Sequence, residues 1–181
     1  GLSRPHMPFK GLIMAILISP MIVPLIITAA GMFFFYSKLG LTHSYTGLIL
    51  AHTALGTPFV VITVTATLTG FDNNLIRASQ SLGADTMRTF FKVIMPLILP
   101  GVISGALFAF ITSFDEVVVV LFVGSVEQVT IPRQMWAGLR QEISPVILCM
   151  ATCLVALSIA LLTTVELLRR RSERLRGIKH R

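Results

Sequence analysis

The sequence predicts an all-α protein that crosses a membrane several times. Of its 181 residues, 54% are hydrophobic and 13% are charged, and the mean hydropathy is +0.84. Soluble domains carry about 25% charged residues, so this composition excludes an ordinary soluble domain. Four apolar stretches also reach the roughly 20 residues with which a helix crosses the apolar core of a bilayer. We therefore expect a multi-pass transmembrane helical bundle.

The four expected spans and their connections divide the chain into successive segments. The third apolar stretch is longer than one crossing requires, and we expect it to break near residue 113. In chain order the segments are a leading segment (1–10), a span (11–36), a loop (37–44), a span (45–68), a charged loop (69–94), the broken span (95–124), a loop (125–144), a span (145–168) and a basic tail (169–181).

Prolines interrupt the first two expected spans. Pro20 and Pro24 lie in the first, and Pro58 lies in the second. The first apolar run is too long for the apolar region of a cleavable signal peptide, so we expect it to stay in the membrane. Membrane helices tolerate proline where neighbouring helices or waters satisfy the freed carbonyl groups. The prolines therefore indicate kinked helices in a packed bundle.

Basic residues are distributed unevenly between the connections. Twelve of the 15 Lys and Arg residues lie in segments 1–10, 69–94 and 169–181. Because basic connections stay on the cytoplasmic side, we expect both ends of this chain and the charged loop in the cytoplasm, and loops 37–44 and 125–144 outside. The basic tail then lies against anionic lipid headgroups. We prefer this interpretation to nucleic-acid binding, because membrane flanks are commonly basic.

The charged loop has the pattern of two short helices joined at a glycine. Asp72 and Asn73 can cap the first helix, and Asp85 can cap the second. Gly83 permits the left-handed turn that ends the first helix. Such a knob could dock on a partner, with its apolar side chains as anchors and its basic side chains against an acidic rim of that partner, or it could form a hairpin on the membrane surface. The expected contact residues are Leu75, Leu82, Met87, Phe90 and Phe91, with basic Arg77, Arg88 and Lys92.

Two adjacent carboxylates, Asp115 and Glu116, lie within the third apolar stretch. Charges at such positions are expensive to bury and usually serve a function, and a pair of carboxylates favours a cationic solute. Ser113 and Glu116 also fit a capping box that would restart a helix after a local break. Adjacent helical residues diverge by about 100°, so the two carboxylates need not face one point. Lining of a solute pathway and capping or ion pairing both remain open.

Three other polar or aromatic residues have competing interpretations. We expect His52 to be hydrogen-bonded within the bundle rather than to be a solute or proton site. Trp136 could contact an amine by a cation–π interaction or belong to the aromatic belt at the membrane interface. Glu166 lies one turn before the basic tail, and we expect it to pair with Arg169 or Arg170.

The sequence shows no pattern typical of catalytic or metal chemistry. Cys149 and Cys153 share a helix face, and we expect them to be small, buried packing residues. No Gly-rich phosphate loop, paired metal-binding motif or nucleophile motif is visible. We therefore expect no catalytic residue, no metal site and no cofactor in this chain.

Residues 74–101 resemble the EAA motif in permeases of ATP-binding-cassette (ABC) importers. That motif consists of a short helix with small residues, a Leu-Gly-Ala turn, a second short helix and a Leu-Pro pair. Its positions are held here by Arg77 (the acidic position), Ala78 and Ser79 (the small positions), Leu82, Gly83 and Ala84 (the turn), and Leu99 and Pro100 (the closing pair).

The resemblance extends over nearly the whole chain. The order of SRPHMPFKG at the start, ISPMIVP from Ile18, TSFDEVVVVLFVG from Thr112 and TIPRQMW from Thr130 is similar to the C-terminal two-thirds of a spermidine/putrescine-type importer permease. Full permeases of this type carry six membrane helices. We therefore expect this sequence to begin after the second of them.

The resemblance implies a partial type I ABC importer permease fold in the bacterial inner membrane, with residues 69–94 as the coupling loop. It implies a cytoplasmic ATPase dimer, a second permease subunit, an external solute-binding protein and membrane lipids as partners. The ATP chemistry would lie in the ATPase, so this chain would not be an enzyme. The implied solute is a polyamine; a related permease for ferric or phosphonate solutes and a non-transporting membrane scaffold are the alternatives. The implied ATPase-coupling residues are Arg77, Ala78, Ser79, Leu82, Gly83, Ala84, Asp85 and Phe90, and the expected substrate-pathway residues are Asp115, Glu116 and Trp136.

Overall fold

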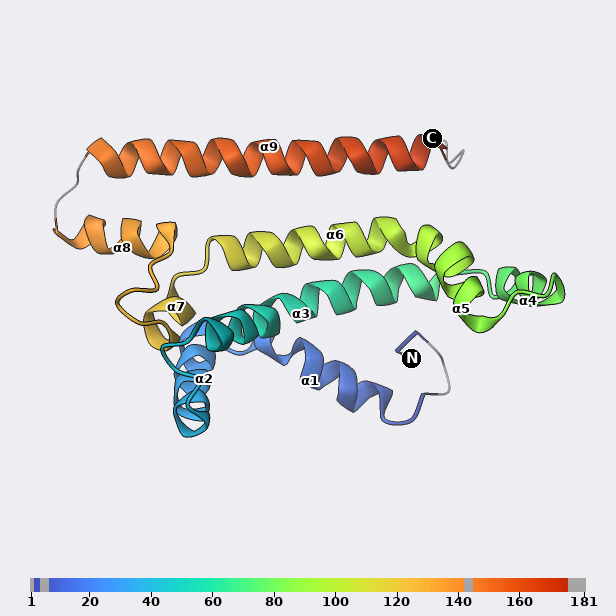
Figure 1. Ribbon diagram of the computed structural model, residues 1–181, viewed down its shortest axis with the longest axis horizontal. Helices are drawn as coiled ribbons and strands as arrows, with labels where there is room; N and C mark the ends of the chain where they lie inside the picture. The colour runs from blue at the N-terminus through green and yellow to red at the C-terminus, as the bar shows by residue number, and fades with distance from the viewer. Residues whose placement is uncertain (1, 4–6, 142–144, 176–181) are drawn as a thin grey trace.

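The regular structure of the chain is helical, as the sequence predicts. A computed structural model describes residues 2–3, 7–141 and 145–175, and the regular elements within these ranges are all helices (Figure 1). In chain order they are α1 (Lys10–Ile22), α2 (Leu25–Leu39), α3 (Tyr45–Thr69), α4 (Asn74–Ser81), α5 (Thr86–Thr89), the π-helix η1 (Phe90–Ile94), α6 (Met95–Phe114), α7 (Val118–Val123), α8 (Ile131–Gln141) and α9 (Pro145–Leu175).

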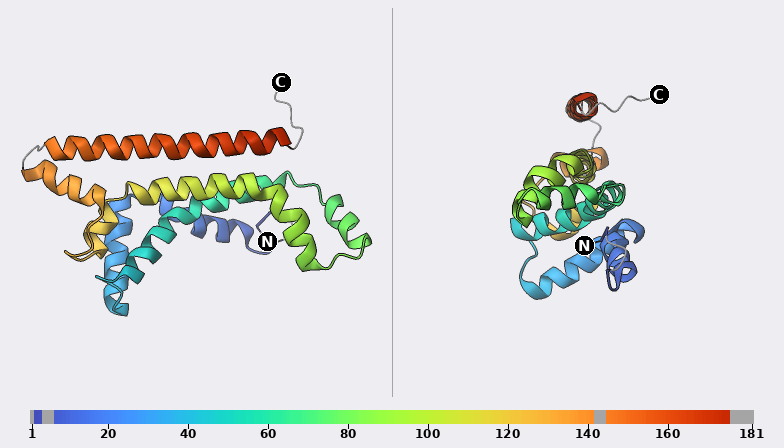
Figure 2. Two further views of the ribbon diagram at one scale, coloured as in Figure 1. Left: turned by 45° about the horizontal axis from the view of Figure 1, so that its top comes forward. Right: turned by 90° about the vertical axis from the view of Figure 1, so that its right-hand side faces the viewer.

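Helices α3 and α6 form the central pair of the bundle, and α9 runs along the outer side of α6 (Figures 1 and 2). Glycines allow α3 and α6 to approach closely. A Cβ atom at Gly56 would come within 2.9 Å of the Ala109 Cβ, and one at Gly105 would come within 2.9 Å of the Val60 Cα. Small residues at such contacts are typical of membrane helix pairs, where close packing replaces the hydrophobic effect as the source of association.

The core of the bundle lies at the end that holds α7. Val119, Val120 and Val123 of this short helix are fully buried. They pack against α2 and α3, including the buried side chains of Ala29 and Leu55. The apolar residues after Asp115 therefore do not continue the α6 helix through a membrane, but return into the bundle as a separate helix.

The first expected span differs from the structure. In place of one helix over residues 11–36, α1 and α2 meet at an angle of 108°. Val23 at the break has extended backbone angles of −73° and 135°, as the residue before a proline prefers because the Pro24 ring disfavours a helical conformation there. Pro20 and Pro58, in contrast, remain inside α1 and α3.

Three further boundaries also differ from those expected. The expected separation between residues 94 and 95 is absent, because the helix is continuous from Thr86 to Phe114 and includes the π-turn η1. The expected loop 125–144 contains α8, and α9 extends beyond residue 168. The helix break itself lies between Phe114 and Val118, near the expected position.

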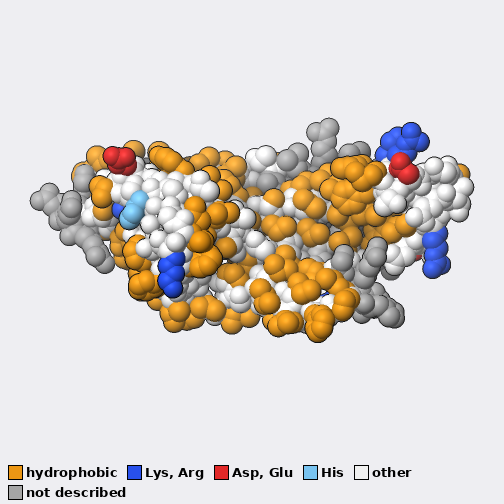
Figure 3. Space-filling view, turned by 60° about the horizontal axis from the view of Figure 1, so that its bottom comes forward, with side chains coloured by type: hydrophobic (Ala, Val, Ile, Leu, Met, Phe, Trp, Pro, Cys, Tyr) orange, Lys and Arg blue, Asp and Glu red, His pale blue; other side chains and the backbone are white. Residues whose placement is uncertain are grey.

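The distribution of side chains is that of a membrane protein. Within the described residues, three helices are long and apolar enough to cross a membrane, or four if the bent pair α1–α2 forms one span. On the face in Figure 3, hydrophobic side chains cover the middle and the visible charged ones lie toward the two ends. Loop α4–α5 and the C-terminal end of α9 share one end of the bundle, and α7 and α8 lie at the other (Figure 1).

The cysteines of α9 lie differently from expectation. Cys149 and Cys153 are both free and exposed, because α9 packs along the edge of the bundle, mainly against α6 and α8. The expected pairing of Glu166 with Arg169 or Arg170 involves side chains outside the described part of the chain.

Candidate functional sites

The coupling loop, residues 69–94, turns at Gly83. Helix α4 ends at Ser81 with Leu82 as its C-cap, and Gly83 adopts a positive φ of 81°. The Gly83 N–H donates to the Gln80 carbonyl at 2.9 Å, and the Ala84 N–H donates to the Ser79 carbonyl at 3.1 Å. These two bonds form a Schellman motif, which requires a left-handed residue at the position of Gly83. The left-handed turn expected from the sequence is present.

The two helices of the coupling loop are capped and joined by polar side chains. The Arg88 N–H donates to the Asp85 carboxylate at 2.7 Å, as the sequence predicts. Asn73 makes no side-chain cap. The Asn74 N–H donates instead to the Asp72 carboxylate at 2.9 Å. Asp72 therefore accepts a hydrogen bond from the first turn of α4 through a local side-chain turn.

A second contact fixes the angle between the halves of the coupling loop. The hydroxyl groups of Ser79 on α4 and Thr89 on α5 share a hydrogen bond of 2.9 Å, and Thr89 is buried. Ser79, at a small position of the EAA-like pattern, therefore faces the inside of the knob. Arg77, at the acidic position, is exposed.

The outer surface of the coupling loop is apolar and basic. Leu82 is 88% exposed, which is unusual for a large aliphatic side chain unless a partner or a lipid covers it. The other four expected apolar contact residues are also exposed, and the three expected basic residues are exposed. The loop thus presents a preformed, mixed surface at one end of the bundle (Figure 1).

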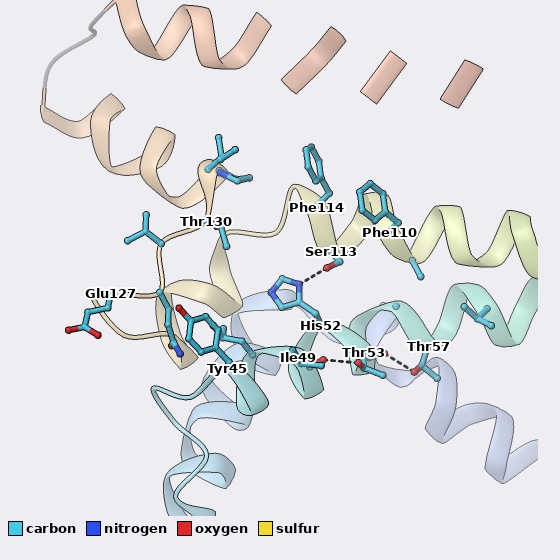
Figure 4. A pocket seen from close by; sticks show the side chains of 18 of the residues that line it. Tyr45, Ile49, His52, Thr53, Thr57, Phe110, Ser113, Phe114, Glu127 and Thr130 are labelled. Atoms are coloured by element: carbon cyan, nitrogen blue, oxygen red, sulfur yellow. Dashed lines mark hydrogen bonds between the residues drawn. The ribbon is translucent and has the colours of Figure 1, made fainter. Parts of the chain in front are cut away.

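A cavity of about 910 Å³, here called cavity 1, lies between α3, α6 and the loop before α8. His52 points from α3 toward Ser113 on α6, and its Nδ1 and the Ser113 hydroxyl share a hydrogen bond of 2.8 Å (Figure 4). His52 is therefore hydrogen-bonded within the bundle, as expected, and also lines the cavity. The remaining wall is mainly apolar, with polar contributions from Thr53, Thr57 and Glu127.

A second cavity of about 430 Å³, cavity 2, lies between the end of α6, α8 and α9. Asp115 and Trp136, both expected in the solute pathway, line it together. Phe114 lines both cavities and stacks on Phe110 with ring centroids 5.5 Å apart. The sequence alone did not predict that a carboxylate and an indole 21 positions apart would share one cavity.

Glu116 differs from Asp115 in burial and in its partners. It is 5% exposed and lines neither cavity. The Val119 N–H donates to both of its carboxylate oxygens at 3.0 and 2.9 Å, and the Val120 N–H donates to one at 3.3 Å. A carboxylate at the first turn of α7 satisfies free amides and interacts favourably with the helix dipole. Glu116 therefore caps the start of α7, which is one of the two roles expected for it from the sequence.

The expected capping box does not form as a pair. Ser113 belongs to α6 and is hydrogen-bonded to His52. Of the two residues of the expected capping box, only Glu116 therefore binds amides of α7. Sequence reasoning also missed Tyr45 and Glu127 in cavity 1. Both come from segments that meet only through the tertiary fold, and no local pattern in the sequence marks them.

Together these features define a polytopic membrane protein with an exposed helical loop at one end and cavities toward the other. The chain belongs to the family of binding-protein-dependent transport system inner membrane components, whose profile matches residues 3–174. The resemblance to an ABC importer permease is therefore confirmed at the level of the family.

Individual relatives agree with this assignment. The chain is 31% identical over 169 residues to the spermidine/putrescine transport system permease protein PotC of Haemophilus influenzae, which corresponds to 93% of this chain and 64% of PotC. It is 32% identical over 106 residues to the putrescine transport system permease protein PotI of Escherichia coli, covering 59% of this chain and 38% of PotI. This chain thus spans less than two thirds of the length of these relatives.

A solved structure shows the same fold. A chain of the MetNI methionine ABC transporter, determined in inward-facing conformations, superimposes with a TM-score of 0.72 and 22% sequence identity. The match covers 94% of this chain and 81% of the MetNI chain. The expected type I ABC importer permease fold is therefore confirmed.

Proposed function

We propose that this chain belongs to a permease subunit of an ABC importer that carries a polyamine and couples to a cytoplasmic ATPase. The relatives PotC and PotI, whose names specify spermidine and putrescine transport, support the solute class. The second permease subunit, the external solute-binding protein and the ATPase dimer are the partners that this function requires. Both ends of the chain and the coupling loop would then face the cytoplasm, as the basic residues predict.

The observation that carries the proposal is the construction of the coupling loop. Its turn is set by Gly83, its halves are joined by the Ser79–Thr89 bond, and its large apolar side chains lie outside. A loop that only covered the bundle would place these side chains inward. A rigid, apolar and basic knob is suited to docking in a groove with an acidic rim.

The loop is mechanically continuous with the cavity region. One helix runs from Thr86 in the coupling loop to Phe114, which lines both cavities, and its α6 part packs closely on α3. A displacement of the knob by the ATPase would therefore move α3 and α6 together at the cavities. Such rigid-body motion is a common means of switching access between two sides.

Cavity 2 supports an assignment of Asp115 and Trp136 to the solute pathway. A carboxylate attracts an ammonium group, and an indole face interacts with it by a cation–π contact. Glu116 would instead position the pathway by holding the start of α7. The carboxylate that is exposed in a cavity is the better candidate for direct contact with a cation.

The test of the proposed docking role is recovery of the ATPase with the detergent-solubilised permease. Replacing Gly83 by Val forces a β-branched residue to a positive φ, at a cost of roughly 1–2 kcal/mol or more, so we expect the turn to open and the ATPase to be lost. Gly70→Val is the matched control, because Gly70 has a negative φ and its Cβ would meet nothing closer than 4.0 Å.

A third variant separates the coupling loop from the basic tail. Deletion of residues 169–181 should leave ATPase recovery intact if the loop is the docking site. Full recovery with Gly83→Val, together with loss on removal of the tail, would assign docking to the tail. Full recovery with all three variants would indicate that neither segment is required and that another surface of the permease binds the ATPase. Failure of the unaltered permease to recover the ATPase would favour the membrane scaffold.

A further inference from the structure

We propose that Glu127 is a cation-binding site at the rim of cavity 1, and therefore a residue that determines which solutes pass. This inference rests on the proposed function, because it requires an organic cation in the pathway. Glu127 lies on the loop between α7 and α8, is exposed, and lines cavity 1. Figure 4 shows it on the outer side of the loop that borders the cavity, with its carboxylate directed away from the His52–Ser113 pair.

The lining of cavity 1 is complementary to an amine with a flexible carbon chain. Its surface is mainly apolar, and Tyr45 and Phe110 add aromatic side chains. Apolar walls suit methylene groups, aromatic faces attract ammonium groups, and a few polar groups fix orientation. Among the described residues that line cavity 1, only Glu127 is acidic. A cation that approaches this cavity past the loop would therefore meet this carboxylate at the outer edge, before it reaches the apolar walls.

The other two carboxylates of this region are not available to cavity 1. Glu116 is buried and accepts amide hydrogen bonds from Val119 and Val120. Asp115 lines cavity 2. Glu127 differs from Glu116 because no hydrogen bond or ion pair with the described part of the chain engages its carboxylate.

The loop that carries Glu127 is tied to α8 and to the loop before α3 by hydrogen bonds. An Arg133 Nη1 donates to the Ser125 carbonyl at 2.5 Å and to the Gln128 carbonyl at 3.0 Å. The buried Gln128 side chain accepts from the Ser125 N–H at 3.0 Å. His43 also bonds this region, through its Nδ1 and the Gly124 carbonyl at 3.2 Å. These bonds hold the backbone on both sides of Glu127, so the place of this residue at the rim is set by the loop, while its exposed side chain extends from it.

Exposure of Glu127 is consistent with a role in entry. A charged group that remains partly in water avoids the desolvation penalty of a buried charge, while its field extends over a Debye length of about 8 Å at physiological ionic strength. By the predicted orientation, loop 125–144 lies outside the membrane. A cation released by the external binding protein would then meet Glu127 before it reaches the rest of cavity 1.

The experiment measures uptake by the complete transporter in lipid vesicles, with the loaded external binding protein titrated to saturation. Spermidine and putrescine serve as separate probes, because they carry different numbers of ammonium groups. For Glu127→Gln we expect the maximal rate of spermidine uptake to fall by about fivefold to tenfold, as for loss of one charge-assisted contact. Putrescine uptake should fall less, and the half-saturating concentration of binding protein should stay unchanged.

Two further variants test charge and position. Glu127→Asp retains the charge and should restore most of the uptake rate. Val126→Glu in the Glu127→Gln background restores the net charge one residue away, at a side chain that is 86% exposed and does not line cavity 1. This second variant should not restore uptake, because the carboxylate would no longer lie at the rim.

Each contrary outcome has a distinct meaning. An unchanged spermidine rate in Glu127→Gln, or full restoration by Val126→Glu, would overturn the rim site while leaving the proposed function intact. A changed half-saturating concentration with an unchanged maximal rate would assign Glu127 to contact with the binding protein instead. Absence of uptake of either amine by the unaltered transporter would overturn the proposed polyamine function, and the rim site with it.

Discussion

At the scale of single residues, two neighbouring carboxylates lie in different surroundings. Asp115 is exposed in cavity 2 with Trp136, whereas Glu116 is buried and binds the amides at the start of α7. The change between them follows from the end of α6 at Phe114, because the chain leaves the helix there and turns successive side chains in different directions. Adjacent acidic residues in a sequence need not form one site.

This division predicts opposite effects of two conservative changes. Asp115→Asn should reduce polyamine uptake by roughly tenfold with little change in thermal stability, because Asp115 is exposed. Glu116→Gln should lower the free energy of unfolding by about 0.5–2 kcal/mol, the range for weakening a helix cap, while uptake by the protein that remains folded is largely retained. Uptake in vesicles at equal membrane abundance and melting temperature in detergent are the two measurements. Stability loss in Asp115→Asn with normal uptake would reverse the assignment.

Cap and turn residues were the part of the site that the sequence predicted best. Gly83 and Asp85 act through bonds that reach only three to five residues along the chain, so local chemistry determines their geometry. Glu127 and Tyr45 could not be found in this way. They line a cavity between α3, α6 and the loop before α8, and only the packing of these distant segments brings them together.

At the scale of elements, three similar prolines show why spans were harder to predict than turns. Pro20 and Pro58 remain inside helices, but Pro24 follows the extended Val23 and separates α1 from α2. Any proline removes one backbone donor, and its surroundings decide whether the helix continues. Here α2 leaves the line of α1 and packs on α7, which was itself expected to be part of a longer span.

The α3–α6 pair makes a prediction about stability. A Cβ at Gly105 would clash with the Thr63 hydroxyl and would lie 2.9 Å from the Val60 Cα, so Gly105→Ala forces the two helices apart. We expect a loss of about 1–3 kcal/mol, as for an overpacked core, measured by thermal unfolding of the detergent-solubilised permease. Gly31→Ala on α2 is the matched control, because a Cβ there would meet no atom within 4 Å. Equal melting temperatures for both variants would show that the pair is not tightly packed.

At the scale of the whole molecule, the proposed docking surface and the proposed solute pathway lie toward opposite ends of the bundle. The coupling loop lies at one end of the bundle, and α7 and α8 lie at the other (Figure 1). The helix from Thr86 to Phe114 connects these ends without a break. The membrane class, the helical fold and the coupling loop were predictable from composition and local pattern. The separation of Asp115 and Glu116 into different environments was not, because it depends on how α7 returns into the core.

The most direct test of this account is ATP-dependent uptake of radiolabelled spermidine by the complete transporter in vesicles, measured beside ATP hydrolysis in the same preparation. With the unaltered coupling loop, we predict that loaded binding protein stimulates both uptake and hydrolysis. Gly83→Val should abolish the ATP dependence of uptake while the permease remains inserted at normal abundance, and Gly70→Val should behave as the unaltered protein. ATP-dependent spermidine uptake that persists at its normal rate in Gly83→Val would contradict the claim that the coupling loop transmits the work of the ATPase to the solute pathway.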